Sequence, residues 1–168
     1  MPVLDLPAFA QSSAKSKPLL GFDVGTTTIG LAIADPGWQV ASPHKTISRK
    51  KWPQDLAAVS AVIRERGVGG LVVGLPRNMD GSEGPRAQSV RAFAQNLLAR
   101  PDLLDGDLPL AFWDERLSTA AVERFLIADD MSRQRRDAVI DKMAAAYILQ
   151  GALDALRAVD HRIAPADA

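Results

Sequence analysis

Two short apolar runs, separated by a three-residue turn that begins with a glycine, limit most strongly what this chain can fold into. Leu19–Val24 and Thr28–Ala34 lie on either side of Gly25 in the stretch LLGFDVGTTTIGLAIA. Runs of this length predict a hairpin of two strands, of which the first is largely buried. Asp23 lies inside that first run, where an unpaired carboxylate is costly. The fold must therefore give Asp23 an internal partner, or the site must bind a metal or another ligand.

Strands alternate with helices in the remainder of the chain. Further strands are predicted over Trp38–Thr46, Gly70–Leu75 and Leu108–Trp113. Helices are predicted over Pro53–Gly67 and Pro85–Arg100, in a short segment capped by Ser118 or Thr119, and in a long final segment capped by Ser132. This order predicts an α/β fold: a mixed β-sheet flanked by helices, with parallel central strands and an antiparallel meander at one edge.

The length of 168 residues fits one domain. We assign residues 1–18 to a flexible N-terminal tail, residues 19–160 to the folded domain and residues 161–168 to a C-terminal tail. The leading residues lack the basic start and continuous apolar core of a secretory signal, and no run approaches the ~18 apolar residues of a membrane span. The chain also contains no cysteine. We therefore expect a soluble, cytoplasmic protein.

Charge and composition restrict the kind of binding site. Lys plus Arg and Asp plus Glu both number 20, so the chain lacks the overall basic field of many nucleic-acid-binding proteins. A nucleic-acid site must therefore be local. With no cysteine and only His44 and His161, we expect neither a thiolate site nor a histidine-rich metal site.

Acidic residues lie where three predicted elements begin or end. Asp23 is late in the first strand, Asp114 and Glu115 directly follow the strand LPLAFW, and Asp141 is near the start of the last helix. If the parallel strands are neighbours, their ends converge, and the helix adds a third carboxylate. Carboxylates this close raise one another's pKa values unless a hard divalent cation neutralises them. Mg²⁺ or Mn²⁺ fits this description, and the pattern points to hydrolysis of a phosphodiester bond.

Each of these acids also has an ordinary structural interpretation. Asp114 can form a surface ion pair with Arg116, and Asp141 can favour the start of a helix and lie near Lys142. Asp23 can accept hydrogen bonds from the turn that follows it. The spacing alone leaves both interpretations open.

Four blocks, in order, resemble the YqgF (RuvX) family of ribonuclease H-like, Holliday-junction-resolvase-like nucleases. The blocks are LGFDVGTTTIGLAIAD, LVVGLPRNMDGSEGPRAQSVRAFA, WDERLSTAAVE and SRQRRDAVIDKMAAAYILQGALD. The resemblance implies a ribonuclease H-like fold and catalytic, metal-binding acids at Asp23, Glu115 and Asp141. It implies processing of the 5′ end of precursor 16S rRNA, with Holliday junction resolution as the alternative activity. Thr27 and Thr28 depart from the family pattern, because members often carry basic residues there, as in GTKRIG.

Several polar residues are candidates for nucleic-acid binding. The glycines and Pro85 of the loop PRNMDGSEGPR permit a tight backbone that opens a helix, so the loop can hold a phosphate or simply form a turn. A basic cluster precedes Asp141 and can be a solvated face or a backbone contact. The candidates are Arg77, Asn78, Arg86, Arg116, Arg133, Arg135, Arg136 and Lys142.

Two functions of other classes compete with the nuclease. DVGTTTIG also resembles the first phosphate-binding turn of actin-like sugar kinases, but those enzymes need two such domains and this chain has room for one. A catalytically silent nucleic-acid-binding module is the second rival, and the presence of all three acids disfavours it. The expected partners are precursor rRNA or branched DNA and ribosomal particles, for a monomer or homodimer.

Overall fold

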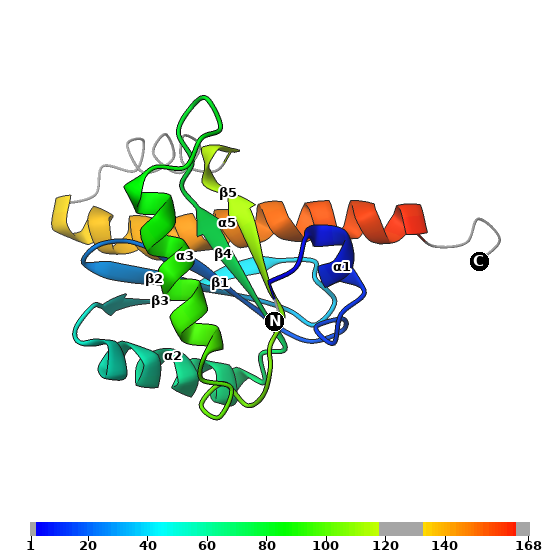
Figure 1. Cartoon of the computed structure of the whole chain (residues 1–168), viewed down its shortest axis with the longest axis horizontal. Helices are drawn as coiled ribbons and strands as arrows, with labels where there is room; N and C mark the ends of the chain where they lie inside the picture. Colours follow the sequence, from blue (N-terminus) through cyan, green and yellow to red (C-terminus); the bar gives the residue numbers. More distant parts are fainter. Residues whose placement is uncertain (1–2, 118–132, 164–168) are drawn as a thin grey trace.

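A computed structural model of the chain describes residues 3–117 and 133–163, with side chains described over 3–116 and 140–159. The strands are β1 (Leu19–Val24), β2 (Thr28–Ala34), β3 (Ala41–Ser48), β4 (Gly70–Leu75) and β5 (Leu110–Asp114). The helices are α1 (Leu6–Ala10), α2 (Trp52–Arg66), α3 (Pro85–Leu98), the short 3₁₀ helix η1 (Glu115–Leu117) and α5 (Arg133–Ile163). Figure 1 shows their arrangement.

The five strands form one mixed sheet in the order β3-β2-β1-β4-β5. β1 pairs with β2 and β2 with β3 in antiparallel fashion, whereas β1 pairs with β4 and β4 with β5 in parallel. The predicted α/β fold is therefore confirmed. Because β1, β4 and β5 are parallel, their carboxyl ends converge at one edge of the sheet, where functional groups of such folds commonly gather.

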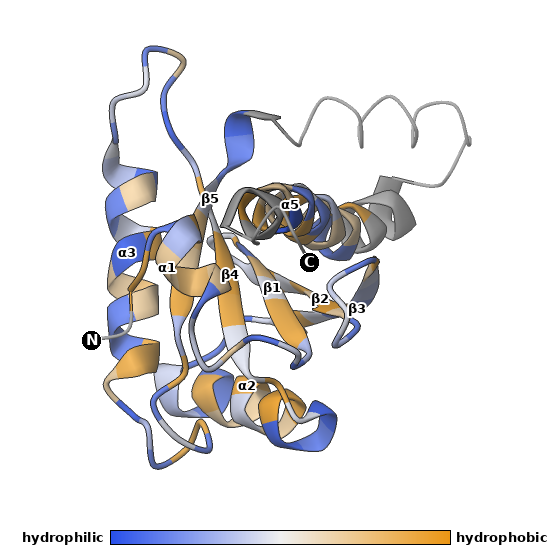
Figure 2. Cartoon of the chain, turned by 90° about the vertical axis from the view of Figure 1, so that its right-hand side faces the viewer, coloured by the Kyte–Doolittle hydropathy of each residue, from blue (hydrophilic) through white to orange (hydrophobic). Residues whose placement is uncertain are grey.

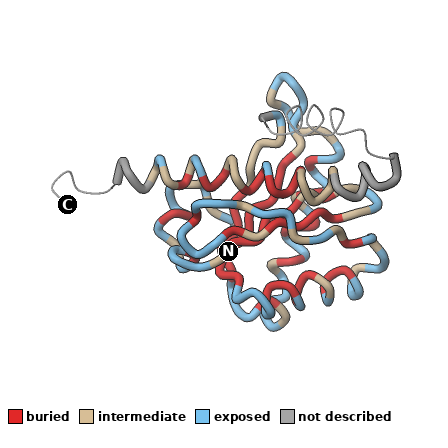
Figure 3. The backbone as a smooth tube through the Cα atoms, turned by 180° about the vertical axis from the view of Figure 1, so that it is seen from behind, coloured by how far each residue is buried: buried red, intermediate tan, exposed pale blue. Residues whose placement is uncertain are grey.

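Helices cover both faces of the sheet. α2 and α3 pack on one face around a core that includes Leu20, Phe22 and Phe93, and α5 crosses the other face, where Leu149 packs with Val72. Figure 2 shows the apolar strands between these two helical layers. The buried residues accordingly follow the strands and the helix surfaces that face them (Figure 3). Burial on both faces explains why the central strands are continuous apolar runs.

The expected N-terminal tail is wrong for residues 3–18, which pack against the domain. Asp5 caps α1 by accepting a hydrogen bond of 2.9 Å from the Ala8 amide. Phe9 is fully buried beside Trp38, with 6.1 Å between ring centroids. The Leu4 amide also donates to the Leu110 carbonyl over 2.8 Å. The apolar residues of this segment thus extend the core on the α5 face. The prediction of a tail was wrong because the short polar stretch before the first strand suggested a domain boundary.

Several predicted boundaries also move, most of them by one or two residues; the strand predicted over Leu108–Trp113 is Leu110–Asp114, so Asp114 ends it. The third strand begins at Ala41, not Trp38, because Asp35 accepts hydrogen bonds from the Gly37, Gln39 and Val40 amides and holds the chain in a turn. α5 continues to Ile163, beyond the expected end of the domain. The predicted short helix after Ser118 and the cap at Ser132 lie outside the described residues. Within the described ranges, no helix is long and apolar enough to cross a membrane.

Candidate active site

Asp23 lies at the carboxyl end of β1 and faces α5. Side chains alternate along a strand, and Gly21, two residues earlier, lies against Leu149 of α5. Burial raises the pKa of the Asp23 carboxyl, and the charge of Asp141 raises it further. A hydrogen bond shared with Glu115 and the positive charge of Arg86 act in the opposite direction. Asp23 is therefore a partly buried acid among other acids.

Glu115 follows the last residue of β5 and begins η1. A Cβ atom at Gly74 of β4 would lie only 2.7 Å from Glu115 Oε1, so the side chain lies directly over that glycine. Burial, the charge of Asp23 and the hydrogen bond to Asp23 together raise the pKa of Glu115 to about 7, against a smaller lowering by Arg86. Near neutral pH, the pair therefore shares a proton in the absence of a cation.

Asp141 brings the third carboxylate from α5. Its side chain accepts a hydrogen bond of 2.8 Å from Thr28 Oγ1 at the start of β2. Its charge is felt by Asp23, so the structure brings Asp23, Glu115 and Asp141 together at one edge of the sheet. The turn after Asp23 was expected to donate hydrogen bonds to Asp23. Thr28 instead donates to Asp141 and orients that carboxylate.

Glycines make the close approach of these acids possible. Gly30 of β2 is the register partner of Asp23, and a Cβ atom there would overlap the Asp141 carbonyl group. The backbone of α5 therefore rests on the sheet at the position beside Asp23. Gly30 and Gly74 were not among the site residues predicted from the sequence. A glycine within an apolar strand indicates that another part of the chain approaches the strand closely, but it does not identify that part.

The chemistry of the acid pair fits a divalent cation, which would take the place of the shared proton. Oxygen donors and accumulated negative charge are what Mg²⁺ and Mn²⁺ prefer. Within the described part of the chain, however, no three His, Cys, Asp or Glu side chains are arranged as a complete set of metal ligands. Asp23 and Glu115 share a hydrogen bond, whereas Asp141 interacts with Asp23 through its charge.

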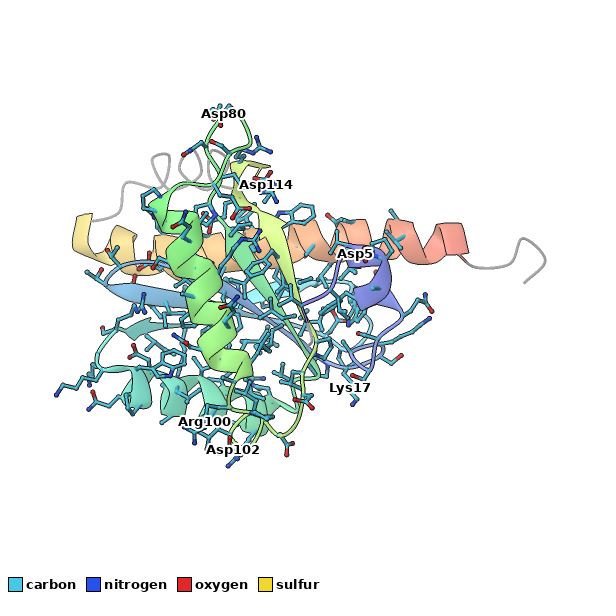
Figure 4. The ribbon with its side chains drawn as sticks, viewed as in Figure 1. Asp5, Lys17, Asp80, Arg100, Asp102 and Asp114 are labelled. Atoms are coloured by element: carbon cyan, nitrogen blue, oxygen red, sulfur yellow. The ribbon has the colours of Figure 1, made fainter. Side chains whose placement is uncertain are left out.

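The loop between β4 and α3 lies at the same edge of the sheet. Figure 4 shows Asp80 at its tip, on the same side of the molecule as Asp114. Asn78 is part of the loop's own framework, because its side chain donates to Ser82 over 3.0 Å. Glu83 forms a bidentate ion pair with Arg91, with contacts of 2.6 and 2.8 Å. These contacts fix the loop internally and attach it to α3.

The basic candidates have different surroundings. Arg86 is exposed in the first turn of α3, and its positive charge lowers the pKa values of both Asp23 and Glu115. Arg77 is exposed and affects Asp114 through its charge. Lys142 is half-buried beside Asp141. The side chains of Arg133, Arg135 and Arg136 lie outside the described residues, although all three belong to α5.

Arg116 forms an ion pair with Asp114, one of the two alternatives that the sequence left open. Its Nε and Nη2 atoms contact the carboxylate at 2.9 and 2.5 Å, which lowers the pKa of Asp114. Nη1 also donates to the Met79 carbonyl over 3.4 Å. Arg116 therefore connects the end of β5 to the loop between β4 and α3.

The chain is similar to known proteins over most of its length. The family model described as "RuvX: Holliday junction resolvase" matches residues 17–155. A relative from Rhodospirillum centenum is 56% identical over 160 residues, covering 95% of this chain and 85% of the relative. A relative from Roseobacter denitrificans is 53% identical over 155 residues, covering 92% and 93%. Both are named as pre-16S rRNA nucleases.

A solved structure confirms the ribonuclease H-like fold. T. thermophilus RuvC in complex with Holliday junction substrate superposes with a TM-score of 0.53 at 17% identity, covering 84% of this chain and 96% of that chain. At this identity the likeness concerns the fold alone. Because a family model and relatives of more than 50% identity match most of its length, the chain belongs to the RuvX family.

Proposed function

We propose that this protein is a metal-dependent nuclease that hydrolyses phosphodiester bonds in the 5′ region of precursor 16S rRNA. The observation that carries the proposal is the approach of three acids to one edge of the sheet. Glu115 lies over Gly74 of β4, and the α5 backbone at Asp141 lies against Gly30, the register partner of Asp23. Burial in this position raises the pKa values of Asp23 and Glu115. Groups with such perturbed pKa values at converging strand ends are typical of catalytic sites. The names of the relatives from R. centenum and R. denitrificans supply the substrate.

Asp23, Glu115 and Asp141 would hold the Mg²⁺ or Mn²⁺ ion. When bound, such an ion activates water and stabilises negative charge on the phosphate and the leaving oxygen. Thr28 keeps the Asp141 carboxylate oriented through its hydrogen bond of 2.8 Å. The burial that raises the pKa values of Asp23 and Glu115 also limits the access of bulk water to the site.

The basic residues around the acids would bind the substrate. Arg86, whose positive charge acts on both acids of the pair, would contact the phosphate that is cleaved. Arg77, Asn78 and Arg116 lie on or beside the loop before α3, which Arg91 attaches to the helix. Contacts of this kind to the phosphate backbone position a strand without reading its sequence. We propose further contacts to the phosphate backbone from the basic residues of α5, which are Arg133, Arg135, Arg136 and Lys142.

Resolution of Holliday junctions is the second candidate function. It is favoured by the description of the matching family model. Both functions use the same acids and the same cleavage chemistry, so they differ only in the nucleic acid that the surrounding surface accepts. For the rRNA function we propose a cytoplasmic protein that acts on ribosomal precursor particles.

Mapping of cleavage products on two substrates tests the proposal. The purified protein is incubated with precursor 16S rRNA and with a four-way DNA junction, each with Mg²⁺, with Mn²⁺ and with a chelator. We expect cleavage near the 5′ end of the rRNA that the chelator abolishes. Cleavage of the junction but not of the rRNA would show that the protein resolves Holliday junctions. Metal-independent binding of both substrates without cleavage would indicate a binding module.

A further inference from the structure

A basic segment that is not among the residues assigned above follows β3 at the edge of the active site. It comprises Arg49, Lys50 and Lys51 and directly precedes α2. Ser48, the last residue of β3, pairs with Thr28, whose hydroxyl binds Asp141. One hydrogen bond and one strand pairing therefore connect the basic segment to the catalytic acids.

Arg49 is held against the turn that follows Asp23. Its amide donates to the Thr27 carbonyl over 2.8 Å, and its Nη1 donates to the Gly25 carbonyl over 2.8 Å. The guanidinium lies 5.8 Å from the centre of the Phe93 ring on α3. Since Arg86 precedes Phe93 by two helical turns, both arginines lie along the same side of α3.

A groove lies along the outer edge of the sheet, next to Arg49 and lined by its chain neighbours Ser48 and Lys50. It has a volume of about 550 Å³ between β3 and the start of α2, and its lining includes the exposed side chains of Lys45, Ser48 and Lys50. Asp55 also lines it, but this carboxylate is 2% exposed, accepts a hydrogen bond from the Lys50 amide and lies 3.8 Å from the Arg49 guanidinium. The charge that the groove presents to solvent is therefore positive.

The groove lies on the α2 and α3 side of the sheet, whereas Asp23 faces α5, so a nucleic-acid strand would reach both by passing over the carboxyl edge of the sheet. Arg86 and the loop before α3 follow β4, on one side of β1, whereas β3 lies two strands away on the other side. Strands in a sheet are about 4.8 Å apart, so β3 lies about 10 Å from β1. A nucleic-acid strand covers such a distance in a few nucleotides. The turn between these two regions carries Thr26, Thr27 and Thr28 and no basic residue.

We propose that Arg49 and the groove lined by Lys45 and Lys50 bind the phosphate backbone of the substrate strand on the β3 side of the catalytic acids. Arg49 supplies a cation beside a turn that has none of its own, and the lysines continue the contact along β3. The proposal rests on the proposed nuclease function, because that function places a strand across Asp23 and Glu115.

Salt-dependent binding tests this surface without relying on cleavage. A short labelled single-stranded RNA is titrated, by fluorescence anisotropy, with the Asp23→Asn protein and with the same protein carrying Lys45→Gln and Lys50→Gln. The matched control is Lys17→Gln, an exposed lysine that Figure 4 shows far from Asp80 and Asp114. Thermal unfolding of each variant establishes that it is folded. Cleavage by the native protein is measured in parallel.

We expect the double lysine substitution to weaken RNA binding by about tenfold, because two phosphate contacts are lost. The slope of log affinity against log salt should become shallower by about 1.4, at about 0.7 for each single-strand contact. Equal affinity and equal slope in the Lys17→Gln and double lysine variants would overturn the groove proposal, even if the native protein cleaves RNA. Lysine-dependent binding with no cleavage by the native protein would support the groove and overturn the nuclease function instead.

Discussion

The Asp23 and Glu115 carboxyl groups are placed at a cost to the fold. Both are partly buried, and each is destabilised as an anion by the other acids of the site. A hydrogen bond between two carboxyl groups needs a proton, so the native state binds that proton more tightly than the unfolded chain does. The unfavourable free energy of two buried carboxylates is relieved either by the shared proton or by a cation. An acid pair of this kind therefore suits a metal-dependent reaction.

The substitution Glu115→Gln should stabilise the metal-free protein at alkaline pH. The pKa of Glu115 rises from 4.5 to about 7 on folding. Below pH 4.5 the Glu115 carboxyl is protonated in both the native and the unfolded state, and stability is unaffected. As the pH rises from 4.5 towards 7, the unfolded state loses this proton first, so the free energy of unfolding falls. The fall is complete above pH 7. Glutamine cannot ionise and avoids this loss. We expect a gain of about 1–3 kcal/mol at pH 8 and little change at pH 4.

Chemical denaturation with a chelator present measures this difference. Glu83→Gln is the control, because the ion pair with Arg91 lowers the pKa of Glu83 and its substitution should reduce stability at pH 8. Equal stabilities of the native and Glu115→Gln proteins at both pH values would contradict the proposed proton sharing.

At the scale of elements, the contact between α5 and β2 determines where Asp141 lies. The helix rests on Gly30, the register partner of Asp23, with no room for a Cβ atom. The neighbouring atoms belong to the backbone of Asp141 and not to a flexible side chain. A larger residue at Gly30 therefore has to move the helix itself.

Gly30→Ala should displace Asp141 and lower both stability and cleavage. Overpacking of this kind costs about 1–3 kcal/mol. We expect a reduced unfolding free energy and a larger loss of cleavage than the change in folded fraction explains. Gly37→Ala is the matched control, since Gly37 is exposed and its nearest neighbour is the end of the Asp35 side chain. Native cleavage by Gly30→Ala would show that this contact does not position the acid.

Several elements followed directly from the sequence. β4 has the predicted bounds, and α2 ends before Gly67, whose φ of 63° suits a glycine. α3 begins at Pro85 as predicted. These elements are specified locally, by apolar runs and by proline and glycine at their ends. The start of β3 was wrong because the Asp35 turn, in which Trp38 adopts a φ of 56°, is stabilised by hydrogen bonds that no apolar pattern indicates.

The residue types of the candidate site could be predicted from the sequence, but its geometry could not. Acids within apolar surroundings pointed to Asp23, Glu115 and Asp141, and the family blocks selected Glu115 over Asp114. The separation of Asp141 from Thr28 by 113 positions shows why the rest was not predictable. Contacts of Thr28, Gly30 and Arg49 depend on the packing of distant elements, and one sequence contains no direct record of that packing.

At the scale of the whole molecule, the N-terminal segment is part of the core. Phe9, Ala10 and Ala14 are buried on the α5 face of the sheet, among residues that include Leu19 and Trp38. Since α5 also carries Asp141, packing of this segment and placement of the third acid depend on the same layer. The segment therefore contributes to stability and not only to the length of the chain.

Phe9→Ala should destabilise the protein by about 3–5 kcal/mol, the range for large-to-small substitutions of buried aromatic residues. A urea denaturation curve measures this loss. Val3→Ala serves as the control, because Val3 is 44% exposed in the same segment. If Phe9→Ala unfolded at the native urea concentration, residues 3–18 would not belong to the core.

The proposed function requires that Asp23, Glu115 and Asp141 act as one cation-dependent catalytic centre. Single-turnover cleavage of precursor 16S rRNA in Mg²⁺ by the native and Asp23→Asn proteins tests it most directly, with the exposed Asp107→Asn as control. We predict a loss of about a thousandfold or more for Asp23→Asn, with RNA binding retained and Asp107→Asn at the native rate. Cleavage by Asp23→Asn at the native rate would show that Asp23 does not belong to the catalytic centre.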